Sequence, residues 1–219
     1  NPLVECSQVQ FGGYVQDDVR LARSLSMSLG LRYEAQTHTS DYLNFAPRFG
    51  TTWSPFKSGS TTIRGGAGIF YEWYDAQTYE QTIRVDGTHQ TDLVVQNPGF
   101  PDPFVGGDVV VLPSSRYLQD ANLTLPRMFR TNIGVEQAVG RYGRVNVSYS
   151  FARGHDLFRG RDINAPLPDG TRPDPAWGNV TQIESAGRSE AQAVNAGFNL
   201  NLPWHRTFLF VNYALMKAK

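Results

Sequence analysis

The sequence predicts an all-β protein, specifically a part of an antiparallel transmembrane β-barrel. Three observations lead to this fold class: apolar residues alternate with small or polar ones, the alternating segments are about 9–11 residues long, and short turns alternate with long polar connections. Alternation with a period of two is the strand pattern, because successive side chains point to opposite faces. A barrel wall meets lipid on one face and water on the other, which accounts for the alternation.

The clearest strand covers residues 25–33, with the sequence LSMSLGLRY, in which every odd-numbered residue is apolar and every even-numbered residue is small or polar. Two segments fit less well. Asp17 and Asp18 interrupt residues 11–21, which predicts a bulge or an interfacial end there, and both faces of residues 207–215 are apolar. Together with five further alternating segments, these make about eight strands of bilayer-crossing length. The five are residues 44–53, 62–72, 129–136, 144–151 and 194–202.

The connections are strongly asymmetric in length. Outer-membrane barrels have short periplasmic turns and long extracellular loops. We therefore expect all the long connections to lie at one end of the sheet, on the extracellular side. The short turns are residues 22–24, 55–61, 140–143 and 203–206, and the long connections are residues 36–43, 74–128 and 153–193.

Composition limits the classes of function. The formal net charge is zero and the pI is about 7.1, which speaks against the basic face that nucleic acid requires. Mean hydropathy is −0.37, and no apolar run of about 18 residues predicts a transmembrane helix. Cys6 is the single cysteine, so an internal disulfide and a cysteine-rich metal site are excluded. A soluble β-sandwich, which would also alternate, is the alternative fold.

The two ends of the chain predict a fragment. The sequence opens at Asn1 without a methionine or a signal peptide, and it stops directly after a strand-like segment. An open sheet with a lipid-facing side would leave two unpaired edges in hydrocarbon. We therefore expect residues 1–219 to be part of one outer-membrane barrel domain, with the remaining strands outside this chain.

Catalytic patterns are lacking in the sequence. The four histidines are scattered, and none has the partner spacing of a zinc site. Residues 64–69, RGGAGI, lack the lysine and hydroxyl residue of a phosphate loop, so they predict a close-packed strand instead. A Gly-x-Ser-x-Gly elbow is also missing. We expect no catalytic residues, no metal, no cofactor and no enzyme activity.

Candidate ligand-binding residues come from the polar face and from the longest connection. Charges are costly towards lipid but hydrated in a lumen, so charged residues on the strands should face inward. Residues 74–128 combine aromatics with prolines, which suits either ligand recognition or a cover over the barrel mouth, and residues 160–178 have the same character. The candidates are Arg32, Glu34, Arg48, Arg64 and Glu72 in the upper lumen, and Trp73, Tyr79 and Arg84 at the start of the connection.

Several segments carry a family resemblance. YVQDDVRLARSLSMSLGLRYE, NFAPRFGTTWSPF, TTIRGGAGIFYE and FARGHDLFRGRDIN resemble the barrel of TonB-dependent outer-membrane receptors of the Oar-like group. ESAGRSEAQAV and FLFVNYALMKAK near the end of the chain are similar to the same group, and the segments occur in the expected order. The resemblance implies a barrel of about 22 strands around a plug, of which this chain supplies about a third of the wall.

The resemblance also implies partners and a location. The complete protein would lie in the outer membrane of a Gram-negative bacterium, in contact with its lipid. It would take up a scarce small-molecule, glycan or peptide ligand, with energy from the TonB system acting through the plug, which lies outside this chain. A passive porin or an adhesin-like surface barrel is the alternative, and a plug with a TonB box would separate the two. A soluble β-rich enzyme or lectin would instead fold in water without detergent.

Overall fold

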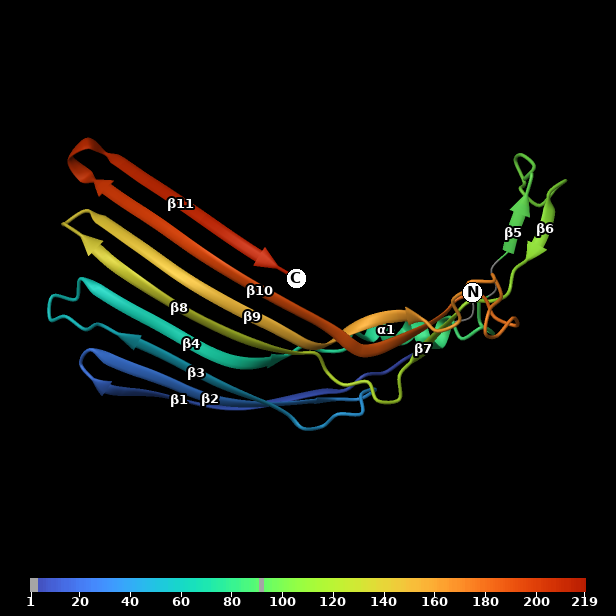
Figure 1. Ribbon diagram of the computed structural model, residues 1–219, viewed down its shortest axis with the longest axis horizontal. Helices are drawn as coiled ribbons and strands as arrows, with labels where there is room; N and C mark the ends of the chain where they lie inside the picture. The colour runs from blue at the N-terminus through green and yellow to red at the C-terminus, as the bar shows by residue number, and fades with distance from the viewer. Residues whose placement is uncertain (1–3, 91–92) are drawn as a thin grey trace.

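The structure, a computed structural model, describes residues 4–90 and 93–219; Asn1, at the end that predicted a fragment, lies outside them. Its main feature is one curved antiparallel sheet (Figure 1). The eight predicted wall strands are all present. In sheet order they are β1 (Gln10–Ala22), β2 (Leu25–Gln36), β3 (Asn44–Trp53), β4 (Thr61–Tyr71), β8 (Arg127–Val139), β9 (Gly143–Asp162), β10 (Val180–Leu202) and β11 (Thr207–Ala218).

The strand register separates the sheet into an apolar face and a polar face, as the alternation predicts. Residues paired across neighbouring strands share a face. One row of the apolar face runs through Leu29, Phe49, Ala67, Thr131 and Phe151. The adjacent row of the polar face runs through Ser28, Gly50, Gly66, Asn132 and Ser150.

Long and short connections lie at opposite ends of the sheet. The short turns between β1 and β2, β3 and β4, β8 and β9, and β10 and β11 gather at the left of Figure 1. The last of these includes the short helix η1 (Pro203–His205). The three long connections gather at the opposite end, as expected from their lengths.

The predicted connection 153–193 is wrong, because β9 and β10 continue far beyond their neighbours. They pair from Gly143 with Leu200 to Asp162 with Thr181, so the true connection is residues 163–179. Two register shifts, on either side of Gly187, interrupt this ladder. The extension carries polar residues on both faces, so it lacks the alternation that marks a bilayer-crossing strand.

The predicted bulge at Asp17 and Asp18 is also wrong. Both residues pair in regular register, Asp17 with Leu29 and Asp18 with Ser28. The irregularity of β1 lies between Arg20 and Ala22, next to the turn. The register therefore places Asp17 on the apolar face beside Leu29 and Asp18 on the polar face beside Ser28, and both side chains are exposed.

The connection predicted at residues 74–128 spans residues 72–126 and contains regular structure. The segment holds α1 (Ala76–Arg84), a hairpin of β5 (Leu93–Gln96) and β6 (Asp108–Val111), and β7 (Arg116–Gln119), which pairs in parallel with β10. Within residues 4–90 and 93–219, no helix has the length and apolar character needed to span a membrane.

Beyond Arg127, where β8 begins, these segments and the extension of β9 and β10 form a separate region, which we call the cap (residues 37–43, 72–126 and 156–188). Its centre is apolar and fully buried: Tyr74, Leu123, Leu125 and Ile183 pack together. Tyr71, Trp73, Tyr79 and Phe158 pack around them. The cap therefore has a small core of its own, whereas the wall exposes both faces of its sheet.

Candidate functional site

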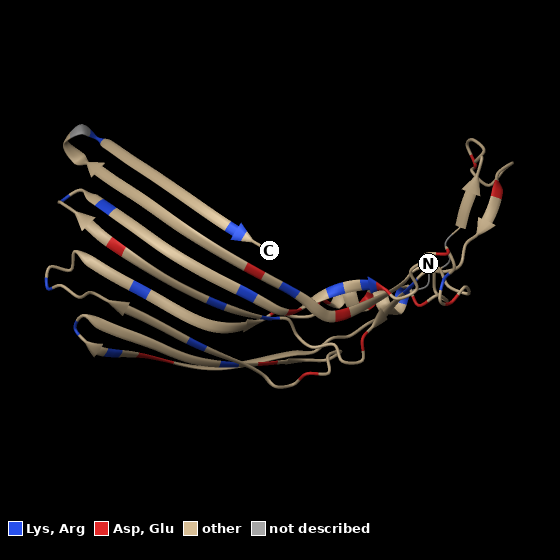
Figure 2. Ribbon diagram, in the orientation of Figure 1, with Lys and Arg blue, Asp and Glu red and all other residues tan. Residues whose placement is uncertain are grey.

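Three arginines stand on the polar face in the middle of the wall: Arg48 on β3, Arg64 on β4 and Arg130 on β8. Figure 2 shows basic bands crossing these three neighbouring strands. The guanidinium carbon of Arg48 lies 4.5 Å from the centre of the Phe70 ring, and that of Arg130 lies 5.5 Å from it. Two cations thus share one aromatic ring, whose electron-rich face attracts each of them.

Gly68 makes room for this arrangement. It pairs with Arg48 on one side and with Arg130 on the other. A Cβ atom at this position would lie 3.1 Å from Cγ of Arg48 and 3.3 Å from Cε2 of Phe70. The stem of Arg48 therefore crosses β4 where there is no side chain, which supports the prediction that residues 64–69 form a close-packed strand.

A hollow of about 470 Å³ lies on the polar face beside these residues. Arg48, Phe70 and Arg130 line one part of it, and the remaining lining includes small side chains and a methionine as well as larger residues such as Phe49, Asn132 and Gln192. The small residues and the methionine are Ser150, Ala152, Ala191, Ala193 and Met216. This volume is in the range of sites for small molecules. A second hollow of about 290 Å³ on the same face is lined by Arg64, Asn132, Glu136 and Asn146.

Two ion pairs neutralise further charges on the polar face. Arg32 forms a close ion pair with Glu34, whose residue is only 4% exposed. Arg144 pairs with Glu136 at 2.8 Å near the short turns. Of the predicted upper-lumen residues, Arg32 and Glu34 therefore neutralise each other. Arg48 and Arg64 form no ion pair with a carboxylate in the part of the chain that the structure describes.

The other predicted residues belong to the cap. The backbone N–H of Glu72 donates a hydrogen bond of 3.0 Å to the carbonyl of Pro126, while its residue is exposed. Trp73 packs on the cap core, and the ring of Tyr79 stacks on His38 with centroids 3.6 Å apart. Arg84 pairs with Glu80 at 2.9 Å. The structure therefore does not bring the eight predicted residues together into one site.

Tyr74 anchors the cap to the wall. The side chain of Gln36, at the end of β2, accepts a hydrogen bond from the Tyr74 backbone N–H at 3.0 Å and donates one to its carbonyl at 3.4 Å. The Tyr74 ring lies 5.1 Å from that of Phe158 on the extended β9. Burial raises the pKa of the Tyr74 phenol to about 12, so the ring stays neutral. This residue is a structural anchor and is not available to a ligand.

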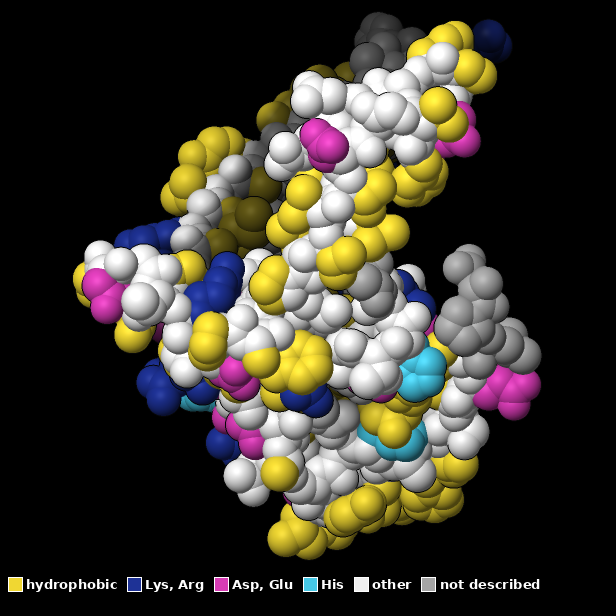
Figure 3. Space-filling model, turned by 90° about the vertical axis from the view of Figure 1, so that its right-hand side faces the viewer, with side chains coloured by type: hydrophobic (Ala, Val, Ile, Leu, Met, Phe, Trp, Pro, Cys, Tyr) yellow, Lys and Arg dark blue, Asp and Glu magenta, His cyan; other side chains and the backbone are white. Residues whose placement is uncertain are grey.

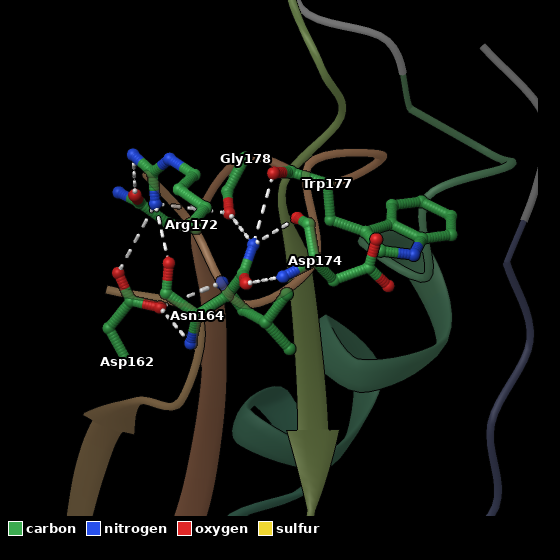
Figure 4. A network of polar contacts seen from close by, with 8 residues as sticks. Asp162, Asn164, Arg172, Asp174, Trp177 and Gly178 are labelled. Atoms are coloured by element: carbon green, nitrogen blue, oxygen red, sulfur yellow. Dashed lines mark hydrogen bonds and ion pairs between the residues drawn. The ribbon is translucent and has the colours of Figure 1, made fainter. Parts of the chain in front are cut away.

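A polar network fixes connection 163–179 (Figure 4). The side-chain amide of Asn164, only 3% exposed, donates to the carbonyls of Asp174, Trp177 and Gly178 at 2.9, 3.0 and 2.9 Å. Its oxygen accepts from the Asp174 N–H at 2.8 Å. The fold of this connection holds Trp177 under the guanidinium of Arg116, 4.5 Å from the ring centre. This contact joins connection 163–179 to β7, which belongs to the longer connection 72–126.

Within the cap, many of the exposed aromatic and aliphatic side chains lie on the hairpin of β5 and β6 and on its tip. Phe100 is 99% exposed, and Phe104 and Val105 are also largely exposed. The hairpin projects away from the rest of the cap in Figure 1. Figure 3, which faces the end of the molecule that carries the cap, shows apolar side chains among polar and charged ones.

Sequence reasoning missed Phe70, Arg130 and Asn164. The first two could have been found, because the alternation places both on the polar face. The two residues lie near Arg48 only because β4 pairs with β8, and residues 72–126 separate these strands in the sequence. No short motif predicts that pairing. No sequence motif predicts the role of Asn164 in the polar network of connection 163–179. No group of three or more metal-ligating side chains occurs in the described part of the chain.

The arrangement of the wall agrees with a comparison against protein families. A model described as "outer membrane beta barrel domain" matches residues 35–218, which is most of the chain. The chain belongs to this family. Its apolar face accordingly meets lipid in the outer membrane of a Gram-negative bacterium, and its polar face lines the lumen of the barrel. A comparison with curated protein sequences finds no match.

Solved outer-membrane barrels share the fold at low sequence identity. The outer membrane transporter YddB from Escherichia coli is 17% identical, with a TM-score of 0.71 over 96% of this chain and 25% of that chain. The siderophore receptor PirA from Pseudomonas aeruginosa is 14% identical, with a TM-score of 0.60 over 95% of this chain and 34% of that one. The FrpB iron transporter from Neisseria meningitidis is 16% identical, with a TM-score of 0.60 over 97% and 26%. The chain thus spans a quarter to a third of the length of these structures.

Proposed function

We propose that the chain is a wall segment of a TonB-dependent receptor of the Oar-like group, which recognises a ligand at the cell surface and takes it up with energy from the inner membrane. The observation that carries the proposal is the placement of an ordered cap directly above a lumen wall with unpaired arginines. A ligand held by the cap would pass next to that wall. The wall serves as scaffold and conduit and performs no covalent chemistry.

The likeness to solved transporters supports the proposal at the level of the fold. Solved structures of this fold include a siderophore receptor, an iron transporter and the RagAB peptide transporter, and the same ligand classes are proposed here together with vitamins and glycans. The exposed tip of the β5 and β6 hairpin is the proposed point of first contact, because its aromatic side chains are not used by the cap core. The plug and its TonB contact belong to the proposed whole protein and not to this chain.

Uptake by the full-length protein tests the proposal. Cells that produce it are offered labelled ferric siderophores, vitamin B12, oligosaccharides and peptides, with and without an active TonB system. We expect the full-length protein to confer uptake of at least one probe class only when TonB is active. Replacing residues 93–111 by a short Gly-Ser linker should abolish most of that uptake without reducing the amount of folded barrel, because the cap core is left intact.

The controls decide between energy coupling and passive passage. Uptake that continues unchanged without TonB would identify a passive porin and contradict the proposal. Folded barrel is quantified by heat-modifiable mobility in gels, so that loss of uptake is not confused with loss of assembly. Normal uptake after removal of the hairpin would contradict the role given to it.

A further inference from the structure

We propose that Arg48 and Arg130 form an anion-binding subsite on the lumen wall for an organic acid that carries at least two carboxylate groups. The proposal rests on the uptake function above, because it names the chemical class of ligand that the wall takes. It concerns residues on three neighbouring strands that form one side of the 470 Å³ hollow.

The spacing of the two arginines suits a polycarboxylate. Their backbones stand on either side of Gly68, two strand spacings apart, which corresponds to about 10 Å between Cα atoms. Both side chains lean towards Phe70, with guanidinium carbons 4.5 and 5.5 Å from the ring centre. The two guanidinium carbons therefore lie at most about 10 Å apart, a separation that one small molecule with two carboxylates can bridge.

The positive charge at this place is not compensated by the protein. No ion pair in residues 4–90 and 93–219 includes Arg48 or Arg130. The Nε atom of Arg48 is buried without a hydrogen-bond partner. The Nε atom of Arg130 donates only to the sulfur of Met128, which is a weak acceptor. Two like charges thus contact one aromatic ring, and neither is neutralised by a carboxylate in the described part of the chain.

The surroundings select the rest of the ligand. Guanidinium groups bind carboxylates in a two-pronged geometry that lysine does not reproduce. The floor of the hollow is largely methyl and methylene surface from Ala152, Ala191 and Met216. Such a surface accepts a short hydrocarbon skeleton beside the charged contacts. Phe70 contacts both cations and so holds them at this hollow.

Binding of a simple polycarboxylate tests the subsite. The full-length protein is purified in detergent, and its affinity for tricarballylate and for acetate is measured by titration calorimetry. Tricarballylate should bind at least about tenfold more tightly than acetate, because only it reaches both arginines. Arg48→Gln and Arg130→Gln should each weaken tricarballylate binding by about tenfold or more, and added salt should weaken binding to the unaltered protein.

Arg141→Gln is the matched control, since Arg141 lies in the short turn between β8 and β9 and loses the same charge. It should leave the affinity unchanged. Heat-modifiable mobility verifies that each variant is folded, and the exposed Arg130 gives a variant that removes little packing. Absence of tricarballylate binding, or equal losses in all three variants, would overturn the subsite.

The outcomes separate this inference from the proposed function. Tricarballylate binding that depends on Arg48 and Arg130, found in a protein whose uptake does not need TonB, would keep the subsite and reject energy coupling. TonB-dependent uptake in a protein whose tricarballylate affinity does not change in the two variants would keep the function and reject the subsite.

Discussion

Replacing Leu29 by arginine is expected to hinder assembly of the full-length barrel, whereas replacing Ser28 by arginine is expected to be far milder. Leu29 lies on the apolar face of β2 and is 53% exposed, beside Phe49. An arginine that faces lipid near the bilayer midplane costs about 2–4 kcal/mol of barrel stability. Ser28 points to the lumen, next to Gly50, where a charge stays hydrated.

Folding of the two variants into lipid vesicles measures this difference. The folded fraction is followed by heat-modifiable gel mobility over a urea series, and Leu29→Arg should lose stability in the stated range relative to Ser28→Arg. Equal stability of the two variants would mean that the assignment of the two faces of β2 is wrong.

Replacing Tyr74 by alanine is expected to open the cap without unfolding the wall. Tyr74 is fully buried, and its ring contacts Phe158 while its backbone is held by Gln36. Removing a buried aromatic side chain costs about 3–5 kcal/mol. The small cap core has few other apolar residues to compensate, so the loss should appear as local opening.

Limited proteolysis of the protein in intact cells measures cap opening. Tyr74→Ala should be cleaved within residues 72–126 much faster than the unaltered protein, with the wall protected. Tyr42→Ala is the control, because Tyr42 is 56% exposed in the cap segment 37–43. Tyr74→Phe should be cleaved no faster than the unaltered protein, since the Tyr74 hydroxyl is buried without a partner. Equal cleavage of the two alanine variants would contradict the anchoring role.

The wall was predictable from sequence because the bilayer imposes a strict pattern on it. Residues 25–33 alternate without exception, since one face must be apolar and the other polar. The alternation of short turns with long connections likewise predicted that the long connections lie at one end of the sheet. The extensions of β9 and β10 lie outside the bilayer, so their residues need not alternate between apolar and polar. In these extensions Glu184 forms ion pairs with Arg159 and Arg161. These contacts depend on the register between β9 and β10, which cannot be predicted from the sequence.

The candidate site was only partly predictable, for a related reason. Alternation indicated that Arg48 and Arg64 face the lumen, and the structure places them there. It could not indicate that Arg32 is neutralised by Glu34, or that Phe70 joins Arg48 to Arg130. The cap was harder still. Its core joins Tyr74 and Leu123 to Ile183, which are far apart in the chain, and nine-residue α1 is too short to leave a clear periodic signal.

Spin-label accessibility along β2 of the full-length protein in lipid tests the central claim most directly. With Cys6 replaced by serine, single labels are placed at Met27, Leu29 and Leu31 and at Ser26, Ser28 and Arg32. The ratio of collision rates with oxygen and with a water-soluble nickel complex is then measured at each position. We expect a high ratio at the first three positions and a low ratio at the other three, alternating with a period of two. Ratios that are uniform along β2, or high on the Ser28 face, would contradict the assignment of this chain as a wall between lipid and lumen.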